Sequence, residues 1–207
     1  MDWTLLFSGL SAGATILIML QLILSFIHKK KEHEEQRRQK TIEILIEWNK
    51  SLERETSFAE KIVEGFSKEQ CIKLFKQESF KVNEEAHKAL CQICCNKNVI
   101  GCDKCQKDDR GEYTVEDRQL LELRWYIISY LNALEAVLVA WQQGAVDRRI
   151  IEREFAYLYS EEKGWDVLSS FRKAAGGAKS YPVIDSFLLK LKENEDKRDK
   201  LLMKFDL

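Results

Sequence analysis

The chain of 207 residues has one proline, Pro182, and it lacks alternating runs of β-branched residues bounded by turns. Proline interrupts helices, and β-branched alternation is typical of half-buried strands. The scarcity of both predicts an all-α fold. Acidic and basic side chains also nearly cancel, with a formal net charge of −1. No overall positive field therefore favours duplex DNA as a partner.

Catalytic motifs are equally scarce. The Gly176-Gly177 pair lacks the G-x-x-x-x-G-K-[ST] context of a phosphate-binding loop. Two of the three histidines, His28 and His33, lie in a charged stretch that is typical of a solvated stalk. No pair of carboxylates stands out from the general excess of Asp and Glu. The sequence therefore predicts that the protein is not an enzyme.

Charge is absent from a mostly apolar run at the N-terminus, residues 3–27, and three lysines follow His28. About 25 helical residues span ~37 Å, enough to cross a hydrocarbon core of ~30 Å. A cleaved signal peptide fits poorly, because no basic residue precedes the run and lysines occupy the place of a small-residue cleavage site. Basic residues flank only the C-terminal side. The sequence therefore predicts one transmembrane helix in the inner (cell) membrane, N-terminus out, with the remaining chain in the cytoplasm.

The transmembrane run has a polar face, because hydroxyl side chains recur at spacings of four and three. Such hydroxyls either bond to carbonyls of their own helix or face neighbouring copies of it. A G-x-x-x-G step beside them would allow close backbone approach. We expect self-association, and a pore would need a trimer or larger ring. The predicted pore or assembly seam comprises Thr4, Ser8, Gly9, Ser11, Gly13, Thr15, Gln21 and Ser25.

Residues 28–66 are predicted to form a stalk helix that continues out of the membrane, because acidic residues precede basic ones at helical spacing. Residues 67–207 are then predicted to form a cytosolic helical domain. Ser67 begins a capping-box sequence, Asn83 and Asp147 are expected to cap two further helices, and Thr114 is expected to open the longest soluble helix.

Two C-x-x-C pairs, Cys91/Cys94 and Cys102/Cys105, lie in residues 91–105. Two such turns can hold zinc tetrahedrally with four thiolates about 2.3 Å from the metal. A cytosolic domain keeps its cysteines reduced or metal-bound, so we expect a structural zinc site, with Cys95 as the alternative to Cys94. The other interpretations are a cysteine-rich helix end or a redox pair. His87, four residues before Cys91, is a further candidate ligand.

Two clusters of basic residues, the second with an aromatic residue, stand out: Arg148 with Arg149, and Arg172 and Lys173 with Lys179 and Tyr181. Arg124-Trp125-Tyr126 also combines basic and aromatic residues. Guanidinium groups pair with phosphates, and aromatic faces stack on unpaired bases. These residues are therefore candidate contacts for single-stranded nucleic acid or a nucleotide. The alternative is that the aromatic residues belong to the core and the arginines only solvate a face.

The stretch Tyr130–Glu135, followed by Gln143–Asp147 and Ile150-Ile151, resembles a bacterial family of single-pass, membrane-anchored helical proteins. In layout the chain is similar to the transmembrane effector of the Hailong antiphage defence system. This resemblance implies an oligomeric ion channel gated by a DNA oligomer or nucleotide that a partner nucleotidyltransferase makes. It also implies that Asn132 and Glu135 form hydrogen bonds between helices. The cysteine pairs lie outside the family pattern.

Three functions follow from these observations. The first is an oligomeric antiphage effector, an ion channel gated by a nucleic-acid or nucleotide ligand of the cytosolic domain. The second is a non-conducting tether or adaptor that recruits a cytosolic partner to the membrane. The third, a zinc-dependent membrane enzyme, would require catalysis to depend on Cys94.

Overall fold

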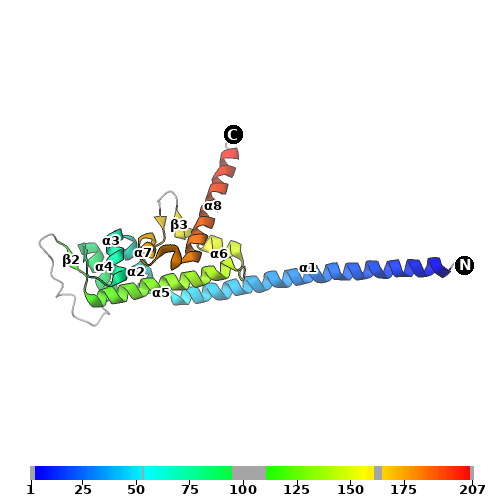
Figure 1. Ribbon diagram of the computed structural model, residues 1–207, viewed down its shortest axis with the longest axis horizontal. Helices are drawn as coiled ribbons and strands as arrows, with labels where there is room; N and C mark the ends of the chain where they lie inside the picture. Colours follow the sequence, from blue (N-terminus) through cyan, green and yellow to red (C-terminus); the bar gives the residue numbers. More distant parts are fainter. Residues whose placement is uncertain (1–2, 53, 95–110, 161–164, 206–207) are drawn as a thin grey trace.

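The computed structural model describes the backbone of residues 3–52, 54–94, 111–160 and 165–205, and the side chains of residues 19–197 within these ranges except 54, 94, 160, 165 and 178. In these parts of the chain, eight α-helices and two pairs of two-residue strands make up the fold (Figure 1). The predicted all-α class is therefore confirmed.

Helix α1 runs without interruption from Trp3 to Ser51. At ~1.5 Å rise per residue its 49 residues span about 73 Å. Only its C-terminal part lies beside the domain, and the N-terminal part projects away from it (Figure 1). The side chains of Thr4, Ser8, Gly9, Ser11, Gly13 and Thr15 lie outside the described residues.

Helix α5, Asp117–Gln142, is the central helix of the domain and contacts α1, α2, α3, α4 and α8. Reciprocal hydrogen bonds between Glu116 and Gln119 begin it, and Gly144 follows its end with a φ of 70°. A left-handed φ suits glycine because it has no Cβ. The expected start at Thr114 differs, because Thr114 pairs with Lys81 in a strand instead.

Helices α2 (Arg54–Glu64), α3 (Lys68–Lys76) and α4 (Glu84–Cys94) surround one end of α5. The order continues with α6 (Arg148–Glu154), α7 (Ser169–Ala174) and α8 (Pro182–Phe205). Antiparallel pairs form between β1 (Lys81–Val82) and β2 (Tyr113–Thr114), and between β3 (Tyr159–Ser160) and β4 (Trp165–Asp166). Short 3₁₀ turns cover Ala156–Leu158 and Gly177–Lys179.

Three caps expected from the sequence are confirmed. Ser67 and Gln70 form a reciprocal capping box at α3. The Asn83 side chain accepts a hydrogen bond from the Ala86 N–H at 2.8 Å before α4. The Asp147 side chain accepts from Arg149 and Ile150 at the start of α6. Each cap satisfies helix N–H groups that have no partner within the helix.

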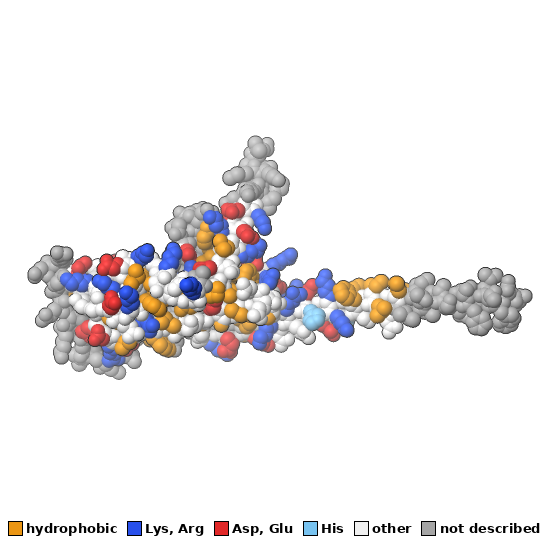
Figure 2. All heavy atoms as spheres, in the orientation of Figure 1, with side chains coloured by type: hydrophobic (Ala, Val, Ile, Leu, Met, Phe, Trp, Pro, Cys, Tyr) orange, Lys and Arg blue, Asp and Glu red, His pale blue; other side chains and the backbone are white. Residues whose placement is uncertain are grey.

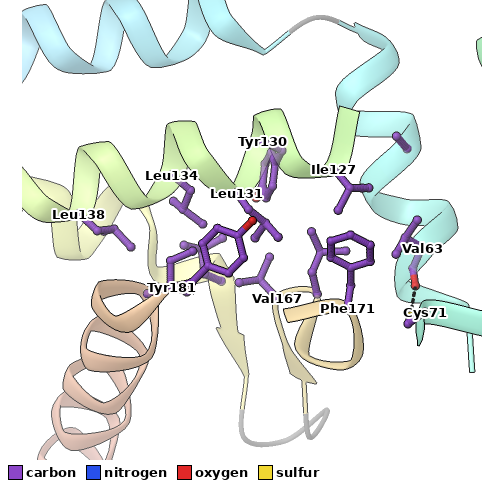
Figure 3. Close-up of a cluster of buried hydrophobic side chains, with 14 of the residues drawn as sticks. Val63, Cys71, Ile127, Tyr130, Leu131, Leu134, Leu138, Val167, Phe171 and Tyr181 are labelled. Carbon is purple, nitrogen blue, oxygen red and sulfur yellow. Dashed lines mark hydrogen bonds between the residues drawn. The ribbon is translucent and has the colours of Figure 1, made fainter. Parts of the chain in front are cut away.

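The core forms where one face of α5 meets α7, α8 and the β3–β4 pair (Figure 3). Leu131, Leu134 and Leu138 of α5 are fully buried there, together with Phe171. Burial of such a side chain stabilises the fold by about 1.5–3 kcal/mol. Helix α5 is also long and apolar enough to cross a membrane, the one such helix that length and composition identify in the described residues. Its packing on five other helices instead makes it the core helix of the domain.

The two buried side chains in the described part of α1, Trp48 and Thr41, fix it to this domain. Trp48 packs against Tyr130 and Phe155, with ring centroids 5.5 Å and 5.3 Å apart. The buried Thr41 hydroxyl accepts a hydrogen bond from the Asp147 N–H at 2.8 Å and donates one to the Arg37 carbonyl at 2.6 Å. Helix α2 then packs on α4 and α5, so the freely projecting helix is shorter than the predicted stalk of residues 28–66.

Candidate functional site

Two adjoining pockets lie where α1 meets the turn between α5 and α6. The corner pocket, about 650 Å³, is lined by Glu34, Arg37, Arg38, Gln143, Gly144, Val146, Asp147, Arg148 and Arg149. The proximal pocket, about 780 Å³, is nearer the N-terminus of α1 and is lined by Phe26, Lys29, Lys30, His33, Gln36, Arg37, Lys40, Gly144 and Ala145. The two pockets share Arg37 and Gly144, so together they form one junction groove.

The junction groove is strongly basic, with seven Lys and Arg side chains and two acidic ones. Arg38 lies 3.9 Å from the Asp147 carboxylate, and Lys40 lies 3.1 Å from that of Glu43. The side chains of Lys29, Lys30, Arg37 and Arg149 form no ion pair within the described part of the chain. Their charges remain available to an anion. Figure 2 shows Lys and Arg side chains where α1 meets the domain and apolar ones farther out along the helix.

Arg148 and Arg149, predicted as a pair, have different surroundings. The Arg148 guanidinium donates to the carbonyls of Trp141 and Gln142 at 3.0 Å and 2.6 Å, and it lies 5.8 Å from the Trp141 ring centroid. A cation there also complements the C-terminal end of α5, so Arg148 builds the pocket wall. Arg149 is exposed, and its guanidinium can reach an anion in the corner pocket.

The second predicted cluster does not form a binding surface. Arg172 is 3% exposed, donates to the Val167 carbonyl at 2.9 Å and forms ion pairs with Asp166 and Asp185. Tyr181 is buried in the core (Figure 3). Neither residue fits the predicted ligand-binding role, because their side chains hold β4, α7 and α8 together. Lys173 and Lys179 are exposed.

Glu135 connects α5 to α8, as the resemblance implied. Its two carboxylate oxygens accept hydrogen bonds from the Val183 and Ile184 N–H groups, both at 3.0 Å. A carboxylate at a helix N-terminus satisfies unpaired donors and complements the helix dipole. Asn132, three residues earlier, is exposed. Glu135 is therefore structural.

A polar cluster behind the α1 joint, formed by the buried Tyr130, the part-buried Glu60 and the half-exposed Tyr157, was not identified from the sequence. The Tyr130 hydroxyl donates to the Glu60 carboxylate at 3.1 Å. Burial raises the pKa of the Glu60 carboxyl, and it raises the pKa of the nearby Tyr157 hydroxyl to about 12. Glu60 is one acidic residue among many in the sequence, so no local signal distinguishes it.

His87 and Cys91 lie together at the end of the domain that contains α4. The His87 Nε2 atom is 3.5 Å from the Cys91 sulfur, and the Gln119 amide donates to this sulfur at 3.8 Å. The His87 ring stacks on Tyr113 at 4.2 Å, and burial lowers its pKa, which favours the neutral imidazole. Neutral imidazole is the form that binds metals.

The other predicted zinc ligands lie outside the described residues: the Cys94 side chain, Cys95, Cys102 and Cys105. Within the described part, no three His, Cys, Asp or Glu side chains form a metal-binding group. Cys91 is in a disulfide rather than reduced or metal-bound as expected from the sequence.

Comparison of the chain with family models, with curated proteins and with solved structures gives no match. The architecture is that of a helical domain with a 49-residue helix whose N-terminal part projects from it, and with a basic groove at their junction.

Proposed function

We propose that the protein is a single-pass membrane effector whose cytosolic domain holds and controls an N-terminal membrane helix. The observation that carries this proposal is the exposed apolar surface of α1 beyond the domain. Leu22, Leu24 and Phe26 are 64%, 65% and 72% exposed. Apolar side chains on a projecting helix are stabilised when hydrocarbon replaces water around them. Lysines follow this surface directly, which favours a cytoplasmic domain at the inner membrane.

The continuity of α1 supports a coupling between domain and membrane. No break separates its apolar part from Thr41 and Trp48, which fix the helix to α5 and α6. A change at this joint therefore tilts or rotates the whole helix as one body. A ligand drives such a change only if it binds the two arrangements with different affinity.

We further propose that several copies assemble through the transmembrane helix as a trimer or larger ring. Gln21 and Ser25 are exposed polar side chains among exposed apolar ones, and a polar group in lipid is favoured where it faces protein or water. Ile42 and Ile46 are also exposed, 58% and 47%, four residues apart on the same helix face. Contact between copies along both stretches would cover these side chains.

The most specific form of the proposal is an antiphage ion channel. Its ligand would be a single-stranded DNA oligomer or nucleotide made by a partner nucleotidyltransferase. The corner pocket supports an anionic ligand, because Arg37 comes from α1 and Arg149 from α6. A phosphate between these two guanidinium groups would join the membrane helix to the domain. The proposal assigns no catalytic residue.

Ion flux from liposomes tests the channel against the tether. The purified full chain is expected to release a trapped ion, and Ser11→Leu or Thr15→Leu is expected to change the rate. Ile18→Leu serves as the control because it keeps an aliphatic side chain of similar size. If the liposomes remain tight with DNA oligomers, with nucleotides and without ligand, the non-conducting tether is correct.

We also propose that the reduced chain binds one structural zinc ion through Cys91, Cys94 or Cys95, Cys102 and Cys105, with His87 as a candidate replacement for one of them. Zinc–nitrogen and zinc–sulfur bonds of about 2.0 Å and 2.3 Å separate two tetrahedral ligand atoms by about 3.5 Å. In the disulfide-bonded chain the His87 Nε2 atom already lies 3.5 Å from the Cys91 sulfur, so after reduction the two atoms could share one zinc ion.

Metal analysis of protein purified under reducing conditions tests the zinc site. About one zinc per chain is expected, and Cys102→Ser should reduce both the zinc content and the stability of the fold, because metal binding and folding are coupled. His87→Gln separates a histidine ligand from a site of four cysteines. A chain that is fully folded without bound metal would contradict the proposal.

A further inference from the structure

The proximal pocket has features that the corner pocket lacks. Four basic side chains line it, from Lys29, Lys30, Arg37 and Lys40, and no acidic residue of the described chain does. The glutamate and aspartate of the junction groove both belong to the corner pocket. The proximal pocket is therefore the more positive half of the groove.

Its position along α1 coincides with the membrane surface. This step rests on the membrane anchoring proposed above, with the apolar run ending at Ile27. Lys29, Lys30 and His33 are then about 3–9 Å beyond the hydrocarbon boundary. The polar headgroup layer extends roughly 5–7 Å on each side of the core. The phosphates of the cytoplasmic leaflet thus lie at the level of these side chains.

We infer that the proximal pocket binds the headgroup of an acidic phospholipid. Lys29 and Lys30 provide point charges at the phosphate level, and the longer Arg37 side chain can extend down toward it. Phe26, 72% exposed, lines the apolar end of the pocket where the acyl chains would begin. One lipid molecule thus matches the order of apolar and basic groups along the helix.

The pocket differs from a polybasic segment that attracts acidic lipids diffusely, because it has a second wall. Gly144 and Ala145, in the turn between α5 and α6, lie opposite the basic face of α1. A headgroup held between them contacts both the membrane helix and the domain. The lipid would therefore stabilise the same joint that the Asp147–Thr41 hydrogen bond fixes.

Single-stranded nucleic acid fits this pocket less well. Proteins that bind single strands combine basic grooves with aromatic faces on which the bases stack. Among the described residues, the one Phe, Tyr or Trp that lines the proximal pocket is Phe26, at the end nearest the bilayer. A base stacked there would enter the headgroup layer. The arrangement favours the lipid.

Spin-labelled lipids in liposomes that contain the full chain measure this binding. The protein should bind phosphatidylglycerol with at least about fivefold higher affinity than phosphatidylcholine, measured from the share of each labelled lipid that it immobilises. One charge near an acidic surface changes affinity by roughly this factor. The triple variant Lys29→Gln, Lys30→Gln, Arg37→Gln should lose the preference. The matched control Lys76→Gln, Lys173→Gln, Lys179→Gln removes three exposed charges elsewhere and should keep it.

Ala145→Gln separates a bound lipid from diffuse attraction, because it narrows the pocket at the wall opposite α1 and leaves every charge in place. Ala145 is exposed, so the longer side chain is tolerated. Loss of the preference in this variant supports the pocket. A preference that survives either Ala145→Gln or the triple variant overturns it.

Two further outcomes would be decisive. Equal restriction of both lipids by an inserted protein contradicts the lipid site and leaves the anchor intact, whereas restriction of neither lipid contradicts the anchor as well. Displacement of phosphatidylglycerol by a short DNA oligomer would identify nucleic acid as the occupant and overturn the inference.

Discussion

The two ends of α1 belong to one helix but have opposite surroundings. From residue 19 to residue 40 every side chain is exposed, apolar ones included, whereas Thr41 and Trp48 are buried against α5 and α6. Helical continuity therefore does not require a packed environment along the whole element. The C-terminal part is held by the domain, and the N-terminal part needs another apolar environment, which we propose is the bilayer.

The first prediction tests the buried end of α1 by removing Trp48, which fixes the helix to the domain. Trp48→Ala is expected to lower the free energy of unfolding of the domain by about 3–5 kcal/mol, because the buried indole packs on Tyr130 and Phe155. Denaturant unfolding followed by circular dichroism measures it. Trp125→Ala, at a site 59% exposed, is the control and should cost less than about 1 kcal/mol.

A second pair of variants compares Arg172, which forms ion pairs inside the domain, with Arg149, which is exposed. Arg172→Ala is expected to lower the free energy of unfolding by roughly 2 kcal/mol, below the range for fully buried pairs, because Asp166 and Asp185 are part-exposed. Arg149→Ala should leave stability within about 0.5 kcal/mol and weaken binding of an anionic oligomer. If Arg172→Ala is neutral in thermal unfolding, its ion pairs do not stabilise the domain.

Thr41→Val tests the hydrogen bond between α1 and α6. The valine keeps the shape of threonine but leaves the Asp147 N–H without its acceptor, so a loss of about 1–2 kcal/mol is expected. Thr41→Ser keeps the hydroxyl and is the matched control. Amide hydrogen exchange should report faster opening at the start of α6 in the valine variant. Equal exchange in both variants would show that this bond does not hold the joint.

The smallest effect concerns Cys71, whose thiol is fully buried and lies 4.0 Å from the Val63 carbonyl. Burial raises the pKa of this thiol to about 11. Only a small fraction is thiolate at pH 8, and thiolate is the reactive form. We expect no alkylation by iodoacetamide in the folded chain and complete alkylation in denaturant, measured by mass spectrometry of the Cys71 peptide. Rapid alkylation of folded protein would contradict its burial.

The features predicted from the sequence are those set by neighbouring residues. Ser67, Asn83 and Asp147 cap helices through side chains that reach donors two or three residues away. The periodicity of α5 likewise predicted a helix between about Thr114 and Gln143, close to its observed bounds.

The features that were missed depend on contacts between different elements of the fold, which no local motif indicates. Arg172 resembled a ligand-binding residue because its partners, Asp166 and Asp185, come from a strand and a later helix. The junction groove also has no local signal, since the turn at Gly144 packs beside α1 about one hundred residues away from Arg37 in the sequence. Arg149 is exposed and Arg172 is buried, and this difference is visible only in the tertiary structure.

Protease protection in intact liposomes tests the central claim most directly, because α1 and α5 are both long enough to span a bilayer. Proteinase K digestion followed by mass spectrometry should leave a protected fragment that contains residues 3–27 and ends near Lys29–Lys31. Detergent should abolish the protection. Protection of Asp117–Gln142 instead, or cleavage within residues 3–27 in sealed liposomes, would contradict the proposed anchor.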